Sequence, residues 1–555
     1  MGVTVPSLTG TSSERPDVCY ITDVEGNWDY FLACVQISDA LVLQSIRKSD
    51  GAAELGLVPG WHFVFGGDAC DKGGAIGGSV RVIKSLVQLK QRYPDRVTLI
   101  LGNRDINKLR FTSELALSQL DPMALETTPG PYWVPANKTV SPLDYLKKHI
   151  AARGDMDEEQ VTQDQLDDAN TLAARIRWML SETMGASGEF ERRRRELEYI
   201  QGLCAVPTLI ARGLCAAPEP VTEQDAAASF VESMAEGGFM RQFLQLGQLA
   251  LIIGAPPGCS PPPPPAPSPC LPPRHARACG SPAWCVAGDT FYVHGGLIGS
   301  FRDGATDCYG YVPGAAGRVE DAHDWVRQLN QWYSDELAEW AKQPEWEEET
   351  EEAYLAGKRG GHGLMDYVVP NSLPSVVLGL HLNAKGMPAH LPESIMRPLN
   401  KSGLMRMVIG HTPHGNCPTV IKSGSAAQGS AHFETIMADT SYSDMSKPDN
   451  RGVAVSAVAV RADSTTHVHG ILQDGRPIDY RLQRGIGPSH EIVGLEEPQH
   501  ADHAVERCAS APPHASPQPQ PSPPLPFLRR QVLCEGGARE WGDAALPHRR
   551  LPPAV

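Results

Sequence analysis

The chain has 555 residues, of which 41% are hydrophobic and 21% are charged, a composition typical of a globular protein. Its formal net charge of -16 argues against a protein that binds nucleic-acid duplexes, because such proteins normally carry a basic face. The 13 cysteines lack the spacing of a disulfide framework or of a structural zinc site. No apolar run reaches the length of a membrane span, and the N-terminal residues lack a signal-peptide core. We therefore expect a cytoplasmic protein with no nucleic-acid duplex or membrane partner, and the oligomeric state stays open.

The first hundred residues alternate between predicted strands and predicted helices. Apolar runs predict strands at Val18–Thr22, His62–Phe65 and Val97–Leu101. A helix is expected from Trp28 onward, and an amphipathic helix is expected over Arg81–Arg92. Strand–helix–strand order favours right-handed crossovers and a mostly parallel sheet, so we expect an α/β fold. Side chains that follow such strands gather at the carboxyl edge of the sheet.

The pattern changes after these first elements. Helical periodicity dominates residues 111–254, which predicts a helical insertion or cap over the sheet edge. Four consecutive arginines at 192–195 lie among glutamates, a pattern that favours a solvated helix face over an anion site. The composition of residues 255–287 favours polyproline II and predicts an exposed loop. The split central fold would then occupy residues 17–110 and 288–485.

Further strands are expected late in the chain. They are predicted at Phe433–Ala438, Val453–Val460 and Thr466–Leu472, where the alternation suits a second, more antiparallel sheet packed on the first. Residues 1–16 are polar, and residues 486–555 are rich in proline, serine and histidine without periodicity. We expect both ends of the chain to be disordered.

Five apolar runs end in residues that can hold a metal ion. In chain order these endings are DVEG at 23–26, GDACDKG at 67–73, GNRD at 102–105, HGG at 294–296 and GHTP at 410–413. Each one alone has a simpler explanation as a helix cap, a turn aspartate, an Asx turn or a loop histidine. Together, carboxylates, an amide and two imidazoles behind buried strands suit Mn, Fe, Mg or Zn.

This order of motifs resembles the calcineurin-like metallophosphoesterase superfamily, whose motifs read DxH, GDxxDRG, GNHE, HGG and GHT. The HGG and GHTP forms are most similar to the branch that contains Ser/Thr protein phosphatases and diadenosine tetraphosphatases. Asp439-Thr440 is similar to a late segment of that branch. The resemblance covers residues 17–110 and 288–475, and it implies a metallophosphoesterase-type β-sandwich flanked by helices, into which the helical segment is inserted.

The resemblance also implies two divalent ions and a phosphorylated substrate, which could be a small molecule, a nucleotide or a phosphoprotein. Asp68 would bridge both ions, and Asp23 and Glu25 would complete one ion site. Asn103, His294 and His411 would complete the other ion site. A water activated by both ions would attack phosphorus in line.

Three positions depart from the superfamily pattern. Glu25 stands in place of a histidine and favours Mn or Mg over Fe or Zn. Lys72 replaces an arginine as a substrate-binding residue, which keeps the charge but loses bidentate binding of phosphate. Arg104 replaces the histidine that is thought to protonate the leaving oxygen and that pairs with the aspartate matching Asp71. We assign Arg104 and Asp71 catalytic roles and Arg104 a second role in binding substrate.

Arginine cannot give up its proton near neutral pH, so Arg104 can stabilise charge but cannot act as a general acid. Loss of general acid catalysis typically costs ~10²–10⁴-fold in rate. We therefore expect phosphoanhydrides and aryl phosphates to be better substrates than alkyl phosphates.

Other histidines are interpreted as lying outside the ligand set. His414 is three positions beyond His411, and His467 and His469 alternate on a predicted strand. The leading hypothesis is a metal-dependent phosphoesterase that cleaves phosphate mono- or anhydride bonds. The alternative is a catalytically weak scaffold, derived from such enzymes, that binds metal or phosphate. Glu25 and Arg104 favour the alternative, whereas Asp68 and the preserved histidines favour the enzyme.

Overall fold

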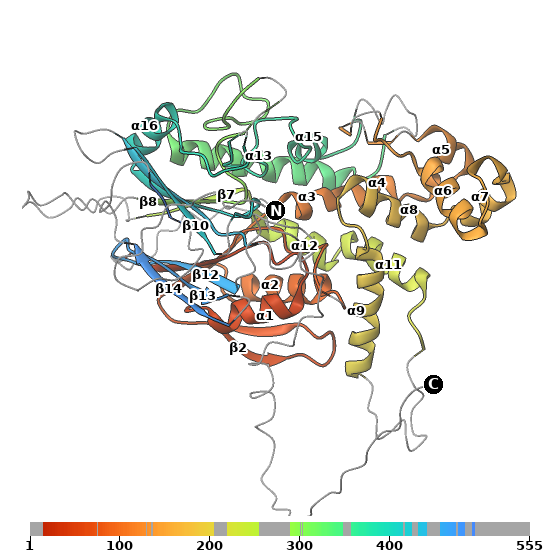
Figure 1. Cartoon of the computed structure of the whole chain (residues 1–555), viewed down its shortest axis with the longest axis horizontal. Coiled ribbons are helices and arrows are strands. Elements are labelled where there is room, and N and C mark those ends of the chain that lie inside the picture. The colour runs from red at the N-terminus through yellow and green to blue at the C-terminus, as the bar shows by residue number, and fades with distance from the viewer. Residues whose placement is uncertain are drawn as a thin grey trace, which may run out of the picture. The chain divides into compact units, whose positions relative to one another are not determined.

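Two β-sheets packed against each other form the centre of the fold, and helices cover their outer faces (Figure 1). The computed structural model describes residues 15–74, 76–128, 130–131, 133–134, 137–204, 219–254, 289–299, 301, 304–347, 357–383, 385–414, 417–424, 431–440, 455–472, 475–482 and 491–493. All of them fall within residues 1–508, which form one compact unit. The predicted proline-rich loop and most of the two predicted disordered ends lie outside the described residues.

The first sheet has seven strands in the order β14-β13-β12-β1-β4-β5-β6. Its parallel half consists of β1 (Asp17–Ile21), β4 (Trp61–Phe65), β5 (Val97–Ile100) and β6 (Gly247–Gln248). Its antiparallel half consists of β12 (Val455–Val460), β13 (Thr466–Ile471) and β14 (Pro477–Leu482). The two late strands expected in a second sheet therefore extend the first sheet.

The second sheet has six strands in the order β15-β10-β11-β9-β8-β7. They are β7 (Ala250–Ile253), β8 (Asp289–Val293), β9 (Leu404–Ile409), β10 (Thr419–Gly424), β11 (His432–Met437) and β15 (Glu491–Val493). Strands β8, β9 and β11 run parallel, and the other pairs are antiparallel. Strand β15 lies inside the segment expected to be disordered. A separate hairpin joins β2 (Leu41–Ile46) and β3 (Ala53–Leu57).

Alternation along the central strands explains the layers. Val18 and Tyr20 of β1 belong to the apolar core between the sheets, where Tyr20 stacks on Tyr292 of β8 with ring centroids 6.0 Å apart. Cys19 and Ile21 point to the opposite face and belong to the core under the helices. Because both faces of these strands are buried, their sequences read as continuous apolar runs. The α/β fold class predicted from the sequence is confirmed.

Two helices cover the first sheet, α1 (Trp28–Ile37) and α2 (Ser79–Arg92), and two lie on the second, α13 (Ala322–Lys342) and α16 (Glu393–Lys401) (Figure 1). The remaining helices are α3 (Asn103–Ile106), α4 (Arg110–Glu114), α5 (Pro122–Thr127), α6 (Pro142–Gly154), α7 (Gln163–Ala169), α8 (Leu172–Trp178), α9 (Glu189–Cys204), α11 (Glu223–Met234), α12 (Phe239–Leu246) and α15 (His362–Tyr367). Single turns of 3-10 helix occur at Asn107–Leu109, Leu117–Leu120 and Glu158–Gln160, and a π-helical turn occurs at Met179–Thr183.

Helices α5 to α8 lie to one side of the two sheets (Figure 1). The stretch 158–184 is divided into several helices, because Thr162 and Thr171 each cap a new helix by accepting a backbone N–H. The boundaries proposed for the insertion and the split fold stay predictions. Within the described part of the chain, no helix combines the length and the apolar character needed to cross a bilayer.

His381 fixes the loop that follows β8. Its Nε2 accepts the backbone N–H of Leu297 at 3.1 Å, and the ring is fully buried. A Cβ added at Gly296 would lie 2.2 Å from the ring, so only glycine fits there. Burial lowers the pKa of His381 to about 3 from its ordinary value of 6.5. The folded state therefore holds a neutral imidazole over a range of pH in which the unfolded chain is protonated.

We expect the fold to lose stability as the pH falls below about 6.5, because unfolding then takes up a proton at His381. The expected loss is at most about 1.4 kcal/mol per pH unit, and it continues until the pH reaches the folded pKa. The measurement compares urea unfolding midpoints at about pH 7.5 and about pH 5, with EDTA present, for the wild type and His381→Asn. Asparagine tolerates the positive φ of 46° at this position. An equal pH dependence in both proteins would contradict the prediction.

Candidate metal centre

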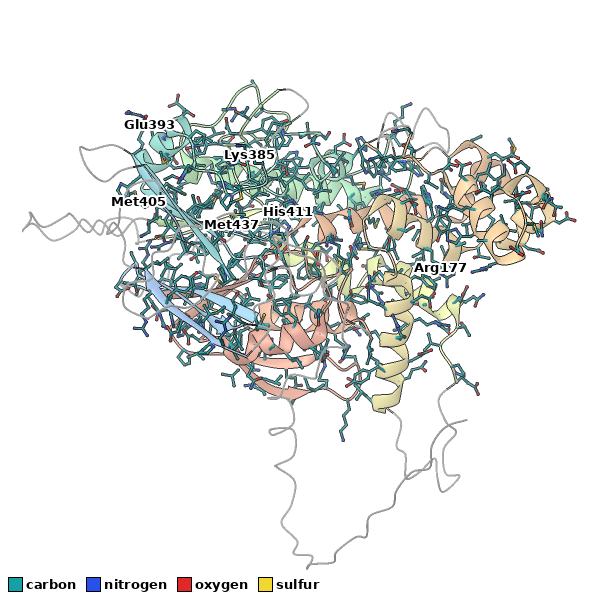
Figure 2. All side chains as sticks on the ribbon, viewed as in Figure 1. Arg177, Lys385, Glu393, Met405, His411 and Met437 are labelled. Carbon is teal, nitrogen blue, oxygen red and sulfur yellow. The ribbon has the colours of Figure 1, made fainter. Side chains whose placement is uncertain are left out.

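All five motifs meet at one end of the sandwich because they follow parallel strands. Asp23 and Glu25 follow β1, and Asp68 and Asp71 follow β4. Asn103 and Arg104 follow β5, and His294 follows β8. His411, which is labelled in Figure 2, follows β9. Strands β1, β4 and β5 are parallel in one sheet, and β8 and β9 are parallel in the other. The carboxyl ends of both parallel sets therefore deliver the motif side chains to the same region.

Backbone strain is concentrated in these motifs. Of nine described residues other than glycine with positive φ, five belong to the predicted site. They are Asp23 at 51°, Glu25 at 45°, Asp68 at 54°, Asp71 at 104° and His411 at 66°. Each such conformation costs about 1–3 kcal/mol and persists only where the surrounding structure fixes it. The loops around the site therefore hold these five residues in their strained conformations.

Three of the predicted metal ligands converge. The ligating atoms of Asp68, His294 and His411 all lie within 4.8 Å of one another. His294 Nδ1 lies 2.8 Å from the Gly66 carbonyl oxygen, to which it donates, so its Nε2 faces Asp68 Oδ1 at 3.4 Å. The ring of His411 lies edge-on to the ring of His294, with centroids 5.1 Å apart. Donor atoms this close to one another can bind the same cation.

Two buried polar atoms support the same interpretation. Asn103 Oδ1 and His294 Nε2 are both buried, and neither makes a hydrogen bond within the described part of the chain. A buried polar atom without a partner costs free energy unless an ion or a water satisfies it. A carboxylate, an amide oxygen and two imidazoles form a donor set that fits Mn, Fe or Zn. Asp68, His294 and His411 therefore fit one divalent ion, and Asn103, which follows Gly102 beside Asp68, offers a further oxygen donor.

The charges around this group shift its protonation. Burial lowers the pKa of His294, but the Asp68 and Asp23 carboxylates outweigh it and raise the value to about 10. Burial and the neighbouring His294 lower the pKa of His411 to about 3. Burial and the nearby Asp439 raise the pKa of Asp23 well above its usual range. Without a bound cation, the carboxylates therefore keep a proton on His294.

Asp23 and Glu25 do not join this group. The Asp23 carboxylate accepts the backbone N–H of His411 at 3.0 and 3.2 Å. Glu25 Oε1 accepts from Arg104 Nε at 2.8 Å and lies 3.7 Å from Lys72 Nζ. Among the described residues, the only groups of three or more His, Cys, Asp or Glu with ligating atoms this close are the one above and a second one. The second group consists of Asp39, His467 and His469. The two-ion ligand set stays a prediction.

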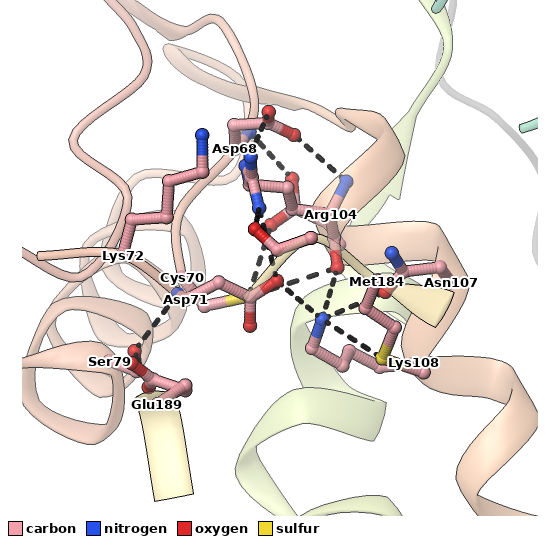
Figure 3. Close-up of polar contacts among 12 residues, drawn as sticks. Asp68, Cys70, Asp71, Lys72, Ser79, Arg104, Asn107, Lys108, Met184 and Glu189 are labelled. Carbon is pink, nitrogen blue, oxygen red and sulfur yellow. Dashed lines mark hydrogen bonds and ion pairs between the residues drawn. The ribbon is translucent and has the colours of Figure 1, made fainter. Parts of the chain in front are cut away.

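The Arg104 side chain is buried among carboxylates (Figure 3). Its Nε lies 2.8 Å from Glu25 Oε1 and 3.4 Å from Asp68 Oδ2, and its Nη1 lies 3.7 Å from Asp71 Oδ2. The ion pair expected between Arg104 and Asp71 is present, but Asp71 has a closer partner. Burial would lower the pKa of Arg104, and the three carboxylates raise it above its ordinary value.

Sequence reasoning missed that closer partner, Lys108. Its Nζ lies 2.8 Å from Asp71 Oδ2 and donates to the Arg104 carbonyl oxygen at 2.9 Å and to Asn107 Oδ1 at 2.8 Å (Figure 3). Burial would lower the pKa of Lys108, and the Asp71 carboxylate raises it. The spacing of four residues from Arg104 could have revealed Lys108, since residues i and i+4 share a helix face.

Asp105 was also missed, and it ties two motifs together. Its carboxylate accepts three backbone N–H groups, those of Asp68, Ala69 and Gly102, each at 2.9 Å. A Cβ added at Gly102 would lie 2.0 Å from Asp68 Oδ1, so a glycine is required where the loops approach. Burial and the charge of Asp68 raise the pKa of Asp105 to about 7. Asp105 therefore positions the loop that carries Asp68.

Helix α9 reaches the site, contrary to the expectation of a solvated face. Arg193 and Glu196 are buried, and Arg195 is the one exposed arginine of the run. Arg192 Nη2 donates to the Asp71 carbonyl oxygen at 2.7 Å. Glu196 accepts the backbone N–H groups at the start of α2 and the Arg81 Nε. The helix carrying the arginine run thus braces the Asp71 loop and caps α2.

No family model matches the chain, and no curated protein sequence matches it. Among solved structures, a cold-active protein-tyrosine phosphatase of a psychrophilic Shewanella species is 13% identical, with a TM-score of 0.31, and the alignment covers 84% of this chain and 80% of that chain. Another structure of a cold-active protein tyrosine phosphatase is 12% identical at 0.31, covering 84% and 78%. A point mutant is 14% identical at 0.32, covering 84% and 80%. These TM-scores are too low for the likeness to indicate a function.

Replacing Asp105 should weaken metal binding without removing a ligand. Asp105→Asn keeps the size but can no longer accept three N–H groups, so the Asp68 loop loses its anchor. We expect the Kd for Mn²⁺ to rise by about 10–100-fold, as is usual for groups that orient ligands. Isothermal titration calorimetry measures this Kd. Glu114→Gln is the control, because Glu114 is also a buried carboxylate but pairs with Arg110 and Arg359 instead of anchoring the Asp68 loop. An unchanged Kd in folded Asp105→Asn would contradict the role.

Proposed function

We propose that the chain is a metal-dependent phosphoesterase that cleaves phosphate mono- or anhydride bonds, as its resemblance to calcineurin-like metallophosphoesterases implies. The observation that carries the proposal is the convergence of Asp68, His294 and His411 within 4.8 Å. Asn103, with its unpartnered buried oxygen, comes from the adjoining strand end. The mixed oxygen and nitrogen donors suit Mn, Fe or Zn, and Mn stays the favoured ion. The expectation of Mg rested on Glu25, which does not join this group. The cytoplasmic location inferred from the sequence stays a prediction.

Positive side chains beside this group support a phosphorylated substrate. A bound divalent ion would polarise a phosphoryl oxygen and acidify a water. Lys72 has a partly exposed side chain, and its ammonium lies beside the Glu25–Arg104 pair, where it can meet an arriving phosphate. Arg104 offers fixed positive charge that stabilises charge on the transferring phosphoryl group. Asp71 contacts Lys108 and Arg104, so it can position both cations, and the catalytic role assigned to it from the sequence stays a prediction.

The same contacts bear on proton transfer to the leaving group. The cations that pair with the Asp71 side chain are Arg104 and Lys108, and the pKa of each is raised by neighbouring carboxylates. Neither of them gives up a proton near neutral pH. A reaction at this site therefore depends on a leaving group that departs without one, which supports a preference for phosphoanhydrides and aryl phosphates.

The first test is turnover of para-nitrophenyl phosphate with Mn, Mg, Zn or no metal. We expect metal-dependent hydrolysis by the wild type and a loss of about 10³-fold or more in Asp68→Asn, because the central carboxylate is removed. Asp324→Asn, on the exposed face of α13, is the matched control and should keep full activity. If the folded wild type hydrolyses no para-nitrophenyl phosphate with any of these metals, the result would favour the alternative hypothesis, a scaffold that binds metal or phosphate.

Leaving-group chemistry provides a second test. We expect kcat/KM for a dinucleotide polyphosphate and for an aryl phosphate to exceed that for a phosphoserine peptide by about 10²-fold or more, since general acid catalysis is worth ~10²–10⁴-fold. The rates of the three substrates are compared at one pH and one Mn concentration. Fastest hydrolysis of the phosphoserine peptide would refute the leaving-group argument.

A further inference from the structure

The Asp68 carboxylate divides the site into two sides with different partners. Oδ1 faces His294 Nε2 at 3.4 Å, on the side where His411 also lies. Oδ2 faces the Arg104 guanidinium at 3.4 Å, and that guanidinium also contacts Glu25 and Asp71. One side of Asp68 thus holds metal-binding donors, and the other side already holds a cation of the chain itself.

We propose that the chain binds one divalent ion, in the group formed by Asp68, Asn103, His294 and His411, and that the Arg104 guanidinium replaces a second ion. The guanidinium occupies the space between Glu25 and Asp68. The inference rests on the proposed function, because it concerns the same site. It replaces the two ions implied by the resemblance with one ion and one fixed organic cation.

Each carboxylate that contacts the Arg104 side chain has a cation of the chain itself as a partner. Glu25, Asp68 and Asp71 have side chains that are 9% exposed or less, so each must be paired. Arg104, Lys108 and Lys72 supply three positive charges within 4.0 Å of these carboxylates. A divalent ion added here would bring two further positive charges beside a guanidinium that cannot deprotonate.

The two unusual motif residues contact each other. Glu25 and Arg104 both stand where the superfamily pattern has histidine, and they form an ion pair at 2.8 Å, as short as the one between Lys108 and Asp71. A histidine at position 25 would offer a neutral donor for a metal, whereas glutamate offers a full negative charge to a guanidinium. Each departure therefore explains the other, although the two residues are 79 positions apart.

The insertion holds the guanidinium in place. Arg104 Nη1 donates to the Gly185 carbonyl oxygen at 3.4 Å, just before α9 begins. The side chain is 11% exposed, and its backbone N–H donates to Asp68 Oδ1 at 3.0 Å. A side chain anchored from three directions cannot swing out to admit an ion without breaking several buried ion pairs.

Counting bound Mn²⁺ tests the proposal. The full chain is loaded with Mn²⁺, freed of excess by gel filtration and assayed for manganese per chain by mass spectrometry. Electron paramagnetic resonance then separates an isolated Mn²⁺ from a spin-coupled pair. We expect one ion per chain and an uncoupled spectrum. The double variant Glu25→His with Arg104→His restores a neutral metal donor at position 25 and removes the guanidinium, and we expect it to take up two ions that are spin-coupled.

Two control variants test whether the counted Mn²⁺ is bound at this site. His411→Ala should lose the ion, because it removes a donor of the proposed group. His467→Gln should leave the count unchanged, because His467 belongs to the separate group with Asp39 and His469.

The outcomes distinguish the inference from the proposed function. No ion in folded wild type would overturn both. Two coupled ions in the wild type would overturn the inference and leave the phosphoesterase proposal standing. One ion in both the wild type and the folded double variant would show that Arg104 does not replace an ion, and would also overturn the inference. The wild-type count decides between one ion and two even if the double variant does not fold.

Discussion

Carboxylates buried at one end of a β-sandwich have to be paired with cations, and the site is built around this requirement. Transferring a carboxylate from water to the interior costs several kcal/mol unless a partner and hydrogen bonds compensate. The chain supplies Arg104 and Lys108 for one side of the cluster. On the other side, Asp68 faces two imidazoles, one of which has a buried nitrogen without a hydrogen bond. The same constraint thus fixes the arginine and leaves a place for an ion.

The helical insertion takes part in this constraint. Glu196 of α9 satisfies backbone N–H groups at the start of α2, and Arg192 satisfies the Asp71 carbonyl. Glu189 accepts the Ser79 hydroxyl at 2.7 Å, also at the start of α2. Buried charged side chains of the insertion therefore replace water at the ends of core elements, where backbone groups lack helical partners. Removing the insertion would expose the Asp71 loop as well as an apolar surface.

The sequence predicts the parts of the site that depend on pattern. Apolar runs that end in glycine and polar residues identify β1, β4, β5, β8 and β9, because buried parallel strands are apolar on both faces. The ligand types that follow them are read from the same positions. The alternation of side chains along a strand indicates which residues are buried, but it does not indicate which strand lies next to it. For this reason the alternation predicts the wrong sheet for the strands at 455–460 and 466–471.

Contacts between distant residues could not be read in this way. Asp105 accepts hydrogen bonds from backbone N–H groups. Since almost every residue type has such a group, the sequence gives no sign of these contacts. Glu25 and Arg104 look like two separate losses in the sequence, and only the fold shows that they pair. The arginines at 192–195 read as a solvated face, since local charge alternation gives no sign of a tertiary partner such as the carbonyl of Asp71.

A guanidinium and a metal ion differ in what they can do for phosphoryl transfer. Both can stabilise negative charge on phosphoryl oxygens, but only a metal ion can acidify a bound water or ligate a leaving oxygen. A site with Arg104 beside one ion keeps the electrostatic contribution and loses the help that a second ion gives to departure. The raised pKa values of Arg104 and Lys108 remove proton transfer from the same place. In the proposed reaction both losses fall on the leaving group, and for this reason we expect the bond that is broken to be a weak one.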